Sequence, residues 1–94
     1  MKFIKIVLAG TLSQITKKLS LELYEGNDVI TVFDVLNKVD KIYNNKILPE
    51  IKNNFSIMFT KDEEPSKLIT LDQIDEIKLG KNNLIKFFYR FTGG

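Results

Sequence analysis

Residues 84–94 of the sequence read LIKFFYRFTGG, a hydrophobic run that leads directly into two glycines. Aromatic and β-branched side chains favour strands, so the run predicts a last strand over residues 84–91. Glycine has no side chain, and the Gly93-Gly94 pair is therefore expected to form a thin, flexible tail that can thread into another protein's active site. Glycines are also tolerated at chain ends without any role. The remainder of the chain decides between these two interpretations.

The composition is that of one small globular domain. Ninety-four residues are enough for a single core, and 44% are hydrophobic and 28% charged, which is typical of soluble proteins. The longest apolar stretch is too short for a transmembrane helix, and residues 1–9 contain Lys5 and too few apolar residues for a signal peptide. We therefore expect a single domain over residues 1–94, a cytoplasmic location and no contact with a membrane.

The sequence lacks the side chains that most catalytic and metal sites use. It contains no cysteine and no histidine, which excludes disulfides, thiolate or imidazole metal ligands and the usual nucleophile relays. The acidic run Asp62-Glu63-Glu64 lies next to Pro65 and lacks the apolar surroundings of a catalytic carboxylate, so we expect a solvated loop there. We predict a protein that is not an enzyme and that itself binds neither a metal nor a cofactor.

The charge pattern argues against a nucleic-acid partner. The net charge is +2 and the lysines are spread among acids, which favours solubility and does not produce a basic stripe. Arg90 is the one arginine among fourteen basic residues and lies four residues from the end of the sequence. Its planar fork of N–H donors suits a carboxylate or phosphate on a partner protein better than a lysine does.

Alternating side chains predict two strands near the start of the chain. Residues 2–9 alternate between two faces, as do residues 19–24, and we expect the two segments to pair as an antiparallel hairpin. A loop or turn is expected between them, over residues 10–18. One face of each strand is apolar and consists of Ile4, Ile6 and Leu8 in the first and of Leu19, Leu21 and Leu23 in the second.

A helix is predicted after the turn at residues 25–28. Thr31 can cap its first turn, with Asp34 three residues later in the position of a capping box. The following residues 46–54 include Pro49 and are expected to form a packed irregular segment or a short turn of helix. Apolar residues of the helix recur at the spacing of one face, namely Val32, Val35, Leu36, Val39, Ile42 and Tyr43.

The second half of the chain predicts further strands separated by turns. Residues 55–60 form a third strand candidate, residues 61–67 a polar surface loop and residues 68–69 a short additional strand. A turn at residues 80–83 precedes the last strand. A hairpin followed by a crossover helix can place the first and last strands side by side, in parallel, at the middle of a mixed sheet. The expected class is α+β, with the helix covering one face of the sheet.

This order of elements, ending in Gly93-Gly94, resembles the ubiquitin-like β-grasp fold, in which a mixed four- to five-stranded sheet packs on one main helix. More narrowly, the chain is similar to the prokaryotic sulfur carriers: the small subunit of molybdopterin synthase, the thiamin sulfur carrier and the ubiquitin-related modifiers of archaea. Where these proteins commonly have a Pro-Pro pair, this chain has Tyr89-Arg90-Phe91. The resemblance rests on residues 2–9, on LELYEG (21–26) leading to TVFDVL (31–36), on LGKN (79–82) and on FTGG (91–94).

The resemblance implies that Gly94 is the reactive residue and that Gly93 lets the tail thread. An adenylating enzyme related to ubiquitin-activating enzymes would use ATP to activate the Gly94 carboxylate, and a sulfur donor would convert it to a thiocarboxylate. The sulfur would then pass to a synthase subunit, with molybdopterin-type synthesis favoured over thiamin synthesis or tRNA thiolation. The alternatives are a protein modifier joined through Gly94 to lysines of target proteins, and a β-grasp interaction module with an incidental Gly-Gly end.

The last strand also predicts a docking surface for the partner. If Ile85, Phe87 and Tyr89 face the helix, the alternate residues of the strand face the open side of the sheet. Exposed apolar patches with aromatic and arginine residues are typical docking sites. Phe88 and Phe91 could instead fill a small secondary core or lie singly on the surface. The predicted docking residues are Phe3, Val7, Phe88, Arg90 and Phe91.

Overall fold

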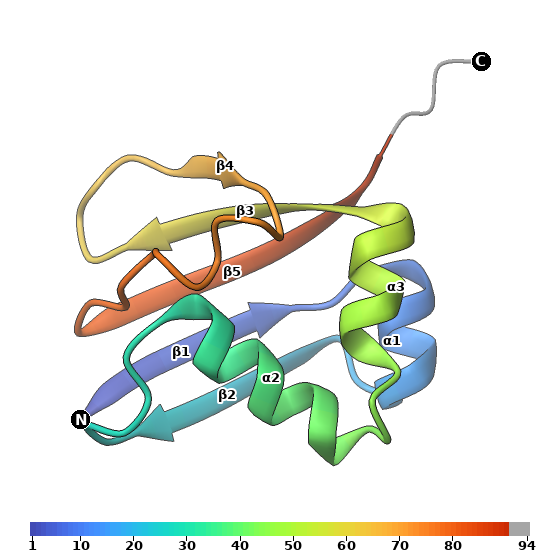
Figure 1. Ribbon diagram of the computed structural model, residues 1–94, viewed down its shortest axis with the longest axis horizontal. Helices are drawn as coiled ribbons and strands as arrows, with labels where there is room; N and C mark the ends of the chain where they lie inside the picture. Colours follow the sequence, from blue (N-terminus) through green and yellow to red (C-terminus); the bar gives the residue numbers. More distant parts are fainter. Residues whose placement is uncertain (91–94) are drawn as a thin grey trace.

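One mixed sheet of five strands forms the centre of the computed structural model, which describes residues 1–90 (Figure 1). The strands are β1 (Lys2–Val7), β2 (Ser20–Glu25), β3 (Phe55–Lys61), β4 (Lys67–Ile69) and β5 (Asn82–Tyr89). Their order in the sheet is β2-β1-β5-β3-β4. The central strands β1 and β5 are parallel and all other neighbours are antiparallel, which confirms the predicted placement of the first and last strands.

Three helices within residues 1–90 complete the α+β fold, namely α1 (Gly10–Thr16), α2 (Val32–Ile42) and α3 (Ile47–Asn54). The prediction of a loop over residues 10–18 is therefore wrong for most of that segment. Residues 47–54 form a regular helix in place of the irregular stretch or single turn that we expected. The sheet thus has two further helices beside α2, the one main helix that the sequence predicts.

The helix α1 is missing from the prediction because it lacks the usual local signals. Its N-cap residue Ala9 offers no side-chain acceptor, and the helix ends at Lys17 in the left-handed conformation, with φ of 62°. Glycine normally takes that position, so the chain gives no visible stop signal there. Leu12 and Thr16 are buried, which indicates that packing against the rest of the domain holds α1 in place.

The start of α2 follows the predicted capping box. Thr31 Oγ1 accepts the N–H of Asp34 at 3.2 Å, and the Asp34 carboxylate accepts the N–H groups of Ile30 and Thr31 at 2.9 Å each. These backbone donations, that of Ile30 first and that of Thr31 next, hold the pKa of Asp34 below its ordinary value. The predicted apolar stripe is wrong at Ile42, which is 61% exposed. A helix turns by about 100° per residue, so Ile42, ten residues after Val32, lies about 80° around the helix axis from the centre of the buried face.

The helix α3 owes its start to a buried carboxylate in α2. Asp40 Oδ1 accepts the N–H groups of Ile47 and Leu48 at 2.8 Å each, which satisfies two donors of the first turn that have no partner within the helix. Pro49 also lies in that first turn, where its missing N–H costs no helical hydrogen bond. The turn between α2 and α3 contains Asn44 and Asn45, both with positive φ.

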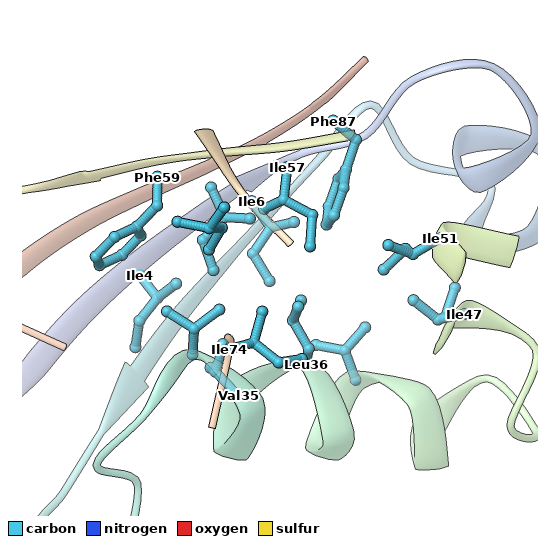
Figure 2. Packing of buried hydrophobic residues seen from close by; sticks show 14 of the residues in the cluster. Ile4, Ile6, Val35, Leu36, Ile47, Ile51, Ile57, Phe59, Ile74 and Phe87 are labelled. Atoms are coloured by element: carbon cyan, nitrogen blue, oxygen red, sulfur yellow. The ribbon is translucent and has the colours of Figure 1, made fainter. Parts of the chain in front are cut away.

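The hydrophobic core lies between the sheet and the helices α2 and α3 (Figure 2). In β1, β3 and β5, most residues that point toward the helices are almost completely buried, whereas the residues that alternate with them are half-buried or exposed. In β2, the inward residues Leu21 and Leu23 are half-buried. The second face of the sheet is therefore open. No helix within residues 1–90 is both long and apolar enough to cross a membrane. Buried residues on the covered face include Ile4, Ile6, Ile57, Phe59, Ile85 and Phe87.

Several strand boundaries differ from the prediction: β1 ends at Val7 and not at residue 9, and β5 ends at Tyr89 and not at residue 91. Leu19 precedes β2 and is 78% exposed, so it does not share the inner face with Leu21 and Leu23. The last strand begins at Asn82 and includes Asn83, which we expected in a turn. The amide of Asn83 is buried and donates to the carbonyls of Phe3 at 3.0 Å and of Gly80 at 2.9 Å. Because these bonds satisfy the side-chain amide of Asn83, this polar residue can occupy an inward position of the central strand.

Candidate functional site

The candidate site begins where the central strand β5 ends. Tyr89 and Arg90 lie at its carboxyl end, where the strand passes beside α3 and α1 (Figure 1). The next residues in the sequence are Phe91 and Thr92, followed by Gly93-Gly94. These four residues lie outside the part of the chain that the structure describes. The roles expected for Phe91, Gly93 and Gly94 therefore stay predictions.

Tyr89 is fixed to the start of α1. Its Oη accepts the backbone N–H of Thr11 at 2.9 Å, and its ring stacks on Phe55 with 4.5 Å between the ring centroids. The ring also lies directly over Gly10, where an added Cβ would come within 1.9 Å of the Tyr89 hydroxyl. Gly10 has a φ of +48°, so the close approach and the backbone conformation both favour glycine at this position.

Arg90 is fixed to the end of α3 and does not face the open side of the sheet as we expected. Its backbone N–H donates to the carbonyl of Asn54 at 2.9 Å. Its guanidinium donates to the carbonyl of Ile51 at 3.3 Å and also to that of Lys52. The strand ends at Tyr89, so strict alternation no longer governs Arg90. The last carbonyls of a helix form the negative end of its dipole and attract a positive charge, which accounts for this orientation.

The helices α1 and α3 are in turn joined to one another beside the end of β5. The Thr11 hydroxyl donates to a carboxylate oxygen of Glu50, and the side-chain amide of Asn54 donates to the same oxygen at 2.9 Å. Thr11 thus contacts β5 through its backbone and α3 through its side chain. The sequence offers no signal for these contacts, because Thr11 and Tyr89 are 78 positions apart.

Three of the predicted docking residues do lie on one face, the open side of the sheet. Phe3 and Val7 are half-buried residues of β1, and Phe88 of β5 is 46% exposed. The register pairs Val7 with Lys86, and Lys86 with Met58 of β3, so these side chains share the face with Phe88. We call Phe3, Val7, Met58, Leu84 and Phe88, with the lysines Lys5 and Lys86 among them, the open-face patch.

The predicted surface loop at residues 61–67 is confirmed in its centre, while its first and last residues belong to β3 and β4. Asp62 has a φ of 51°, and its carboxylate accepts the N–H of Asn82 at 2.9 Å. It therefore joins this turn to the start of β5. Within residues 1–90, acidic side chains nowhere gather in a group of three that could hold a metal ion.

A surface pocket that the sequence did not predict lies next to Arg90. Its volume is about 380 Å³, and its walls come from α3, β3 and the segment that follows β4. Lys52 and Arg90 supply positive charge and Asp72 supplies negative charge among mainly apolar side chains. Comparison of the chain with models of known protein families, with curated proteins and with solved structures finds no match.

Proposed function

We propose that this protein is a β-grasp sulfur carrier whose active form has a free α-carboxylate on Gly94. The observation that carries the proposal is the sheet order β2-β1-β5-β3-β4, with β1 and β5 parallel at its centre and α2 packed on one face. That order is the one expected for a β-grasp domain. It makes the strand that leads into Gly93-Gly94 the middle strand of the sheet, paired with β1 on one side and with β3 on the other.

In this proposal the partner enzyme recognises the folded domain, and the chemistry takes place on the Gly93-Gly94 tail. A carboxylate oxygen of Gly94 attacks the α-phosphorus of ATP on a partner enzyme, and pyrophosphate leaves. The resulting acyl-adenylate is a mixed anhydride. Hydrosulfide then attacks its acyl carbon and AMP leaves, so that one carboxylate oxygen is replaced by sulfur. The carrier contains no cysteine, and the sulfur therefore comes from outside the protein.

The open-face patch supports this function as the surface on which the adenylating enzyme docks. It is apolar apart from two lysines, partly exposed and situated on β5 and its two neighbours, just before the tail. Phe88 is a suitable anchor because aromatic residues contribute strongly at protein interfaces. Lys86 adds a positive charge within the patch, which an acidic residue or a backbone carbonyl of the partner can accept.

The proposal is tested by intact mass spectrometry of the purified protein. It is incubated with ATP, sulfide and the adenylating enzyme purified from the same organism. We expect the mass gain of one oxygen-to-sulfur exchange, and no gain when ATP is left out. A matched variant that ends at Thr92 should show no gain. If the wild-type mass does not change, the proposal is wrong.

The same reaction mixture distinguishes the alternatives. An acyl-adenylate of Gly94 is also open to attack by an amine, so lysine-linked conjugates in a cell extract would indicate a protein modifier. If neither product forms, and removal of Gly93-Gly94 leaves the protein's activity in the cell unchanged, the domain is an interaction module with an incidental Gly-Gly end.

A further inference from the structure

We propose that Tyr89 and Arg90 form a clamp that fixes the point and the direction in which the tail leaves the domain. Both are positioning residues in this account, since they touch α1 and α3 and do not take part in the reaction. The inference rests on the proposed function, because it concerns the delivery of Gly94 to the adenylating enzyme.

Tyr89 is held by more contacts than a surface residue at a strand end requires. It is 53% exposed, so burial in the core does not account for its position. Its hydroxyl accepts from Thr11, its ring stacks on Phe55, and the missing side chain of Gly10 makes room for it. Three different kinds of contact thus converge on one partly exposed phenol.

Arg90, the residue after Tyr89, is held by α3, whereas the Tyr89 hydroxyl is held by α1. Its backbone N–H donates to the carbonyl of Asn54, one residue beyond the end of β5. Its guanidinium donates to two carbonyls of the last turn of α3. A planar guanidinium can donate to both carbonyls at once, whereas an ammonium group is a single compact charge. This role gives a physical reason for arginine at the one position of the chain where it occurs.

The clamp limits how far the reactive carboxylate can move from its point of attachment. Four residues beyond Arg90 span at most about 14 Å, whereas the five residues beyond Tyr89, which stays paired with Phe55 in the sheet, span about 18 Å once Arg90 is released. The volume available to the carboxylate then rises about twofold, and its effective concentration in the partner's active site falls by about twofold. Docking through the open-face patch is not affected by this change.

The test separates docking from delivery by measuring adenylation at different carrier concentrations. ATP–pyrophosphate exchange is followed with the adenylating enzyme from the same organism, using wild type, Tyr89→Phe, Arg90→Lys and the double variant Tyr89→Ala/Arg90→Lys. We expect the kcat of the double variant to fall about twofold with an unchanged KM, and each single variant to show a smaller decrease. Tyr43→Phe is the matched control, because Tyr43 lies at the end of α2, away from β5.

The readouts also show whether a variant failed for structural reasons. Thermal unfolding checks that each variant is folded, and Tyr89→Phe keeps the ring stacked on Phe55 if the double variant is unstable. Amide hydrogen exchange at Arg90 should become faster in the clamp variants and not in Tyr43→Phe. A folded set of variants with the kcat of wild type overturns the clamp while the carrier function stands. If wild type itself supports no exchange, the carrier function fails and the clamp inference fails with it.

Discussion

Replacement of Gly10 by alanine should destabilise the protein through a contact with the other end of the chain. Gly10 has a φ of +48°, a conformation that costs an alanine about 1 kcal/mol. The new Cβ would lie 1.9 Å from the Tyr89 hydroxyl and 2.4 Å from two ring carbons. The ring therefore has to leave its place over α1.

The displaced ring loses two interactions. Its stacking on Phe55 is worth about 0.5–1.5 kcal/mol. The hydrogen bond from Thr11 is worth about 0.5–1 kcal/mol, because water can replace the acceptor at this exposed position. Together with the backbone strain, we expect Gly10→Ala to lower the free energy of unfolding by about 2–3.5 kcal/mol.

Urea unfolding measures this loss against a matched control. Gly26→Ala should change the free energy of unfolding by less than about 0.5 kcal/mol, because a Cβ there meets only the Asp28 carboxylate, at 3.6 Å. In a Tyr89→Ala background the ring is already gone, and Gly10→Ala should cost only about 1 kcal/mol for the backbone. If Gly10→Ala is as stable as Gly26→Ala, the described contact between α1 and the end of β5 is wrong.

Three further predictions concern the capping box, the core and the open-face patch. Asp34→Ala should lower the free energy of unfolding by about 1 kcal/mol at neutral pH. Backbone donation by Ile30 and Thr31 lowers the pKa of Asp34, so its charged carboxylate stabilises the fold at pH values above the ordinary pKa of 3.8. The difference in free energy of unfolding between Asp34→Ala and wild type should therefore shrink as the pH falls below that value. A difference that grows in acid would contradict this. Leu36→Ala, at a fully buried position, should cost about 2–5 kcal/mol, whereas Ile42→Ala should cost little because Ile42 is 61% exposed; equal losses in urea unfolding would refute the described face of α2. Phe88→Ala should raise the KM for adenylation by about fivefold or more without loss of stability, and the exposed Leu19→Ala should leave KM unchanged; similar KM values for both variants would exclude Phe88 as an anchor.

The parts of the fold that could be predicted from sequence are those specified by nearby residues. Alternation identified β1 and most of β2, and the pair Thr31 and Asp34 located the start of α2. The parallel pairing of β1 with β5 followed from chain connectivity, because a hairpin and a crossover helix leave few ways to complete the sheet. Local signals failed at α1, where Lys17 occupies a position that glycine normally takes.

The candidate site was less predictable because its contacts join residues far apart in the sequence. The guanidinium of Arg90 turns toward the carbonyls of the last turn of α3, and the end of that helix was not predicted. The contact of Tyr89 with Gly10 and Thr11 depends on α1, which was also not predicted. Phe3, Val7 and Phe88 were placed on the correct face because strand alternation and the β1–β5 pairing were sufficient for that.

Top-down mass spectrometry of the protein isolated from its own cells tests the central claim most directly. Fragmentation from the carboxyl end would locate any modification to a single residue. We predict a fraction of the protein with one oxygen replaced by sulfur on the Gly94 carboxyl group, and loss of that fraction in cells that lack the adenylating enzyme. A protein in which Gly94 is not the last residue, or in which its carboxyl group is never activated in cells that contain the enzyme, would contradict the proposed carrier function.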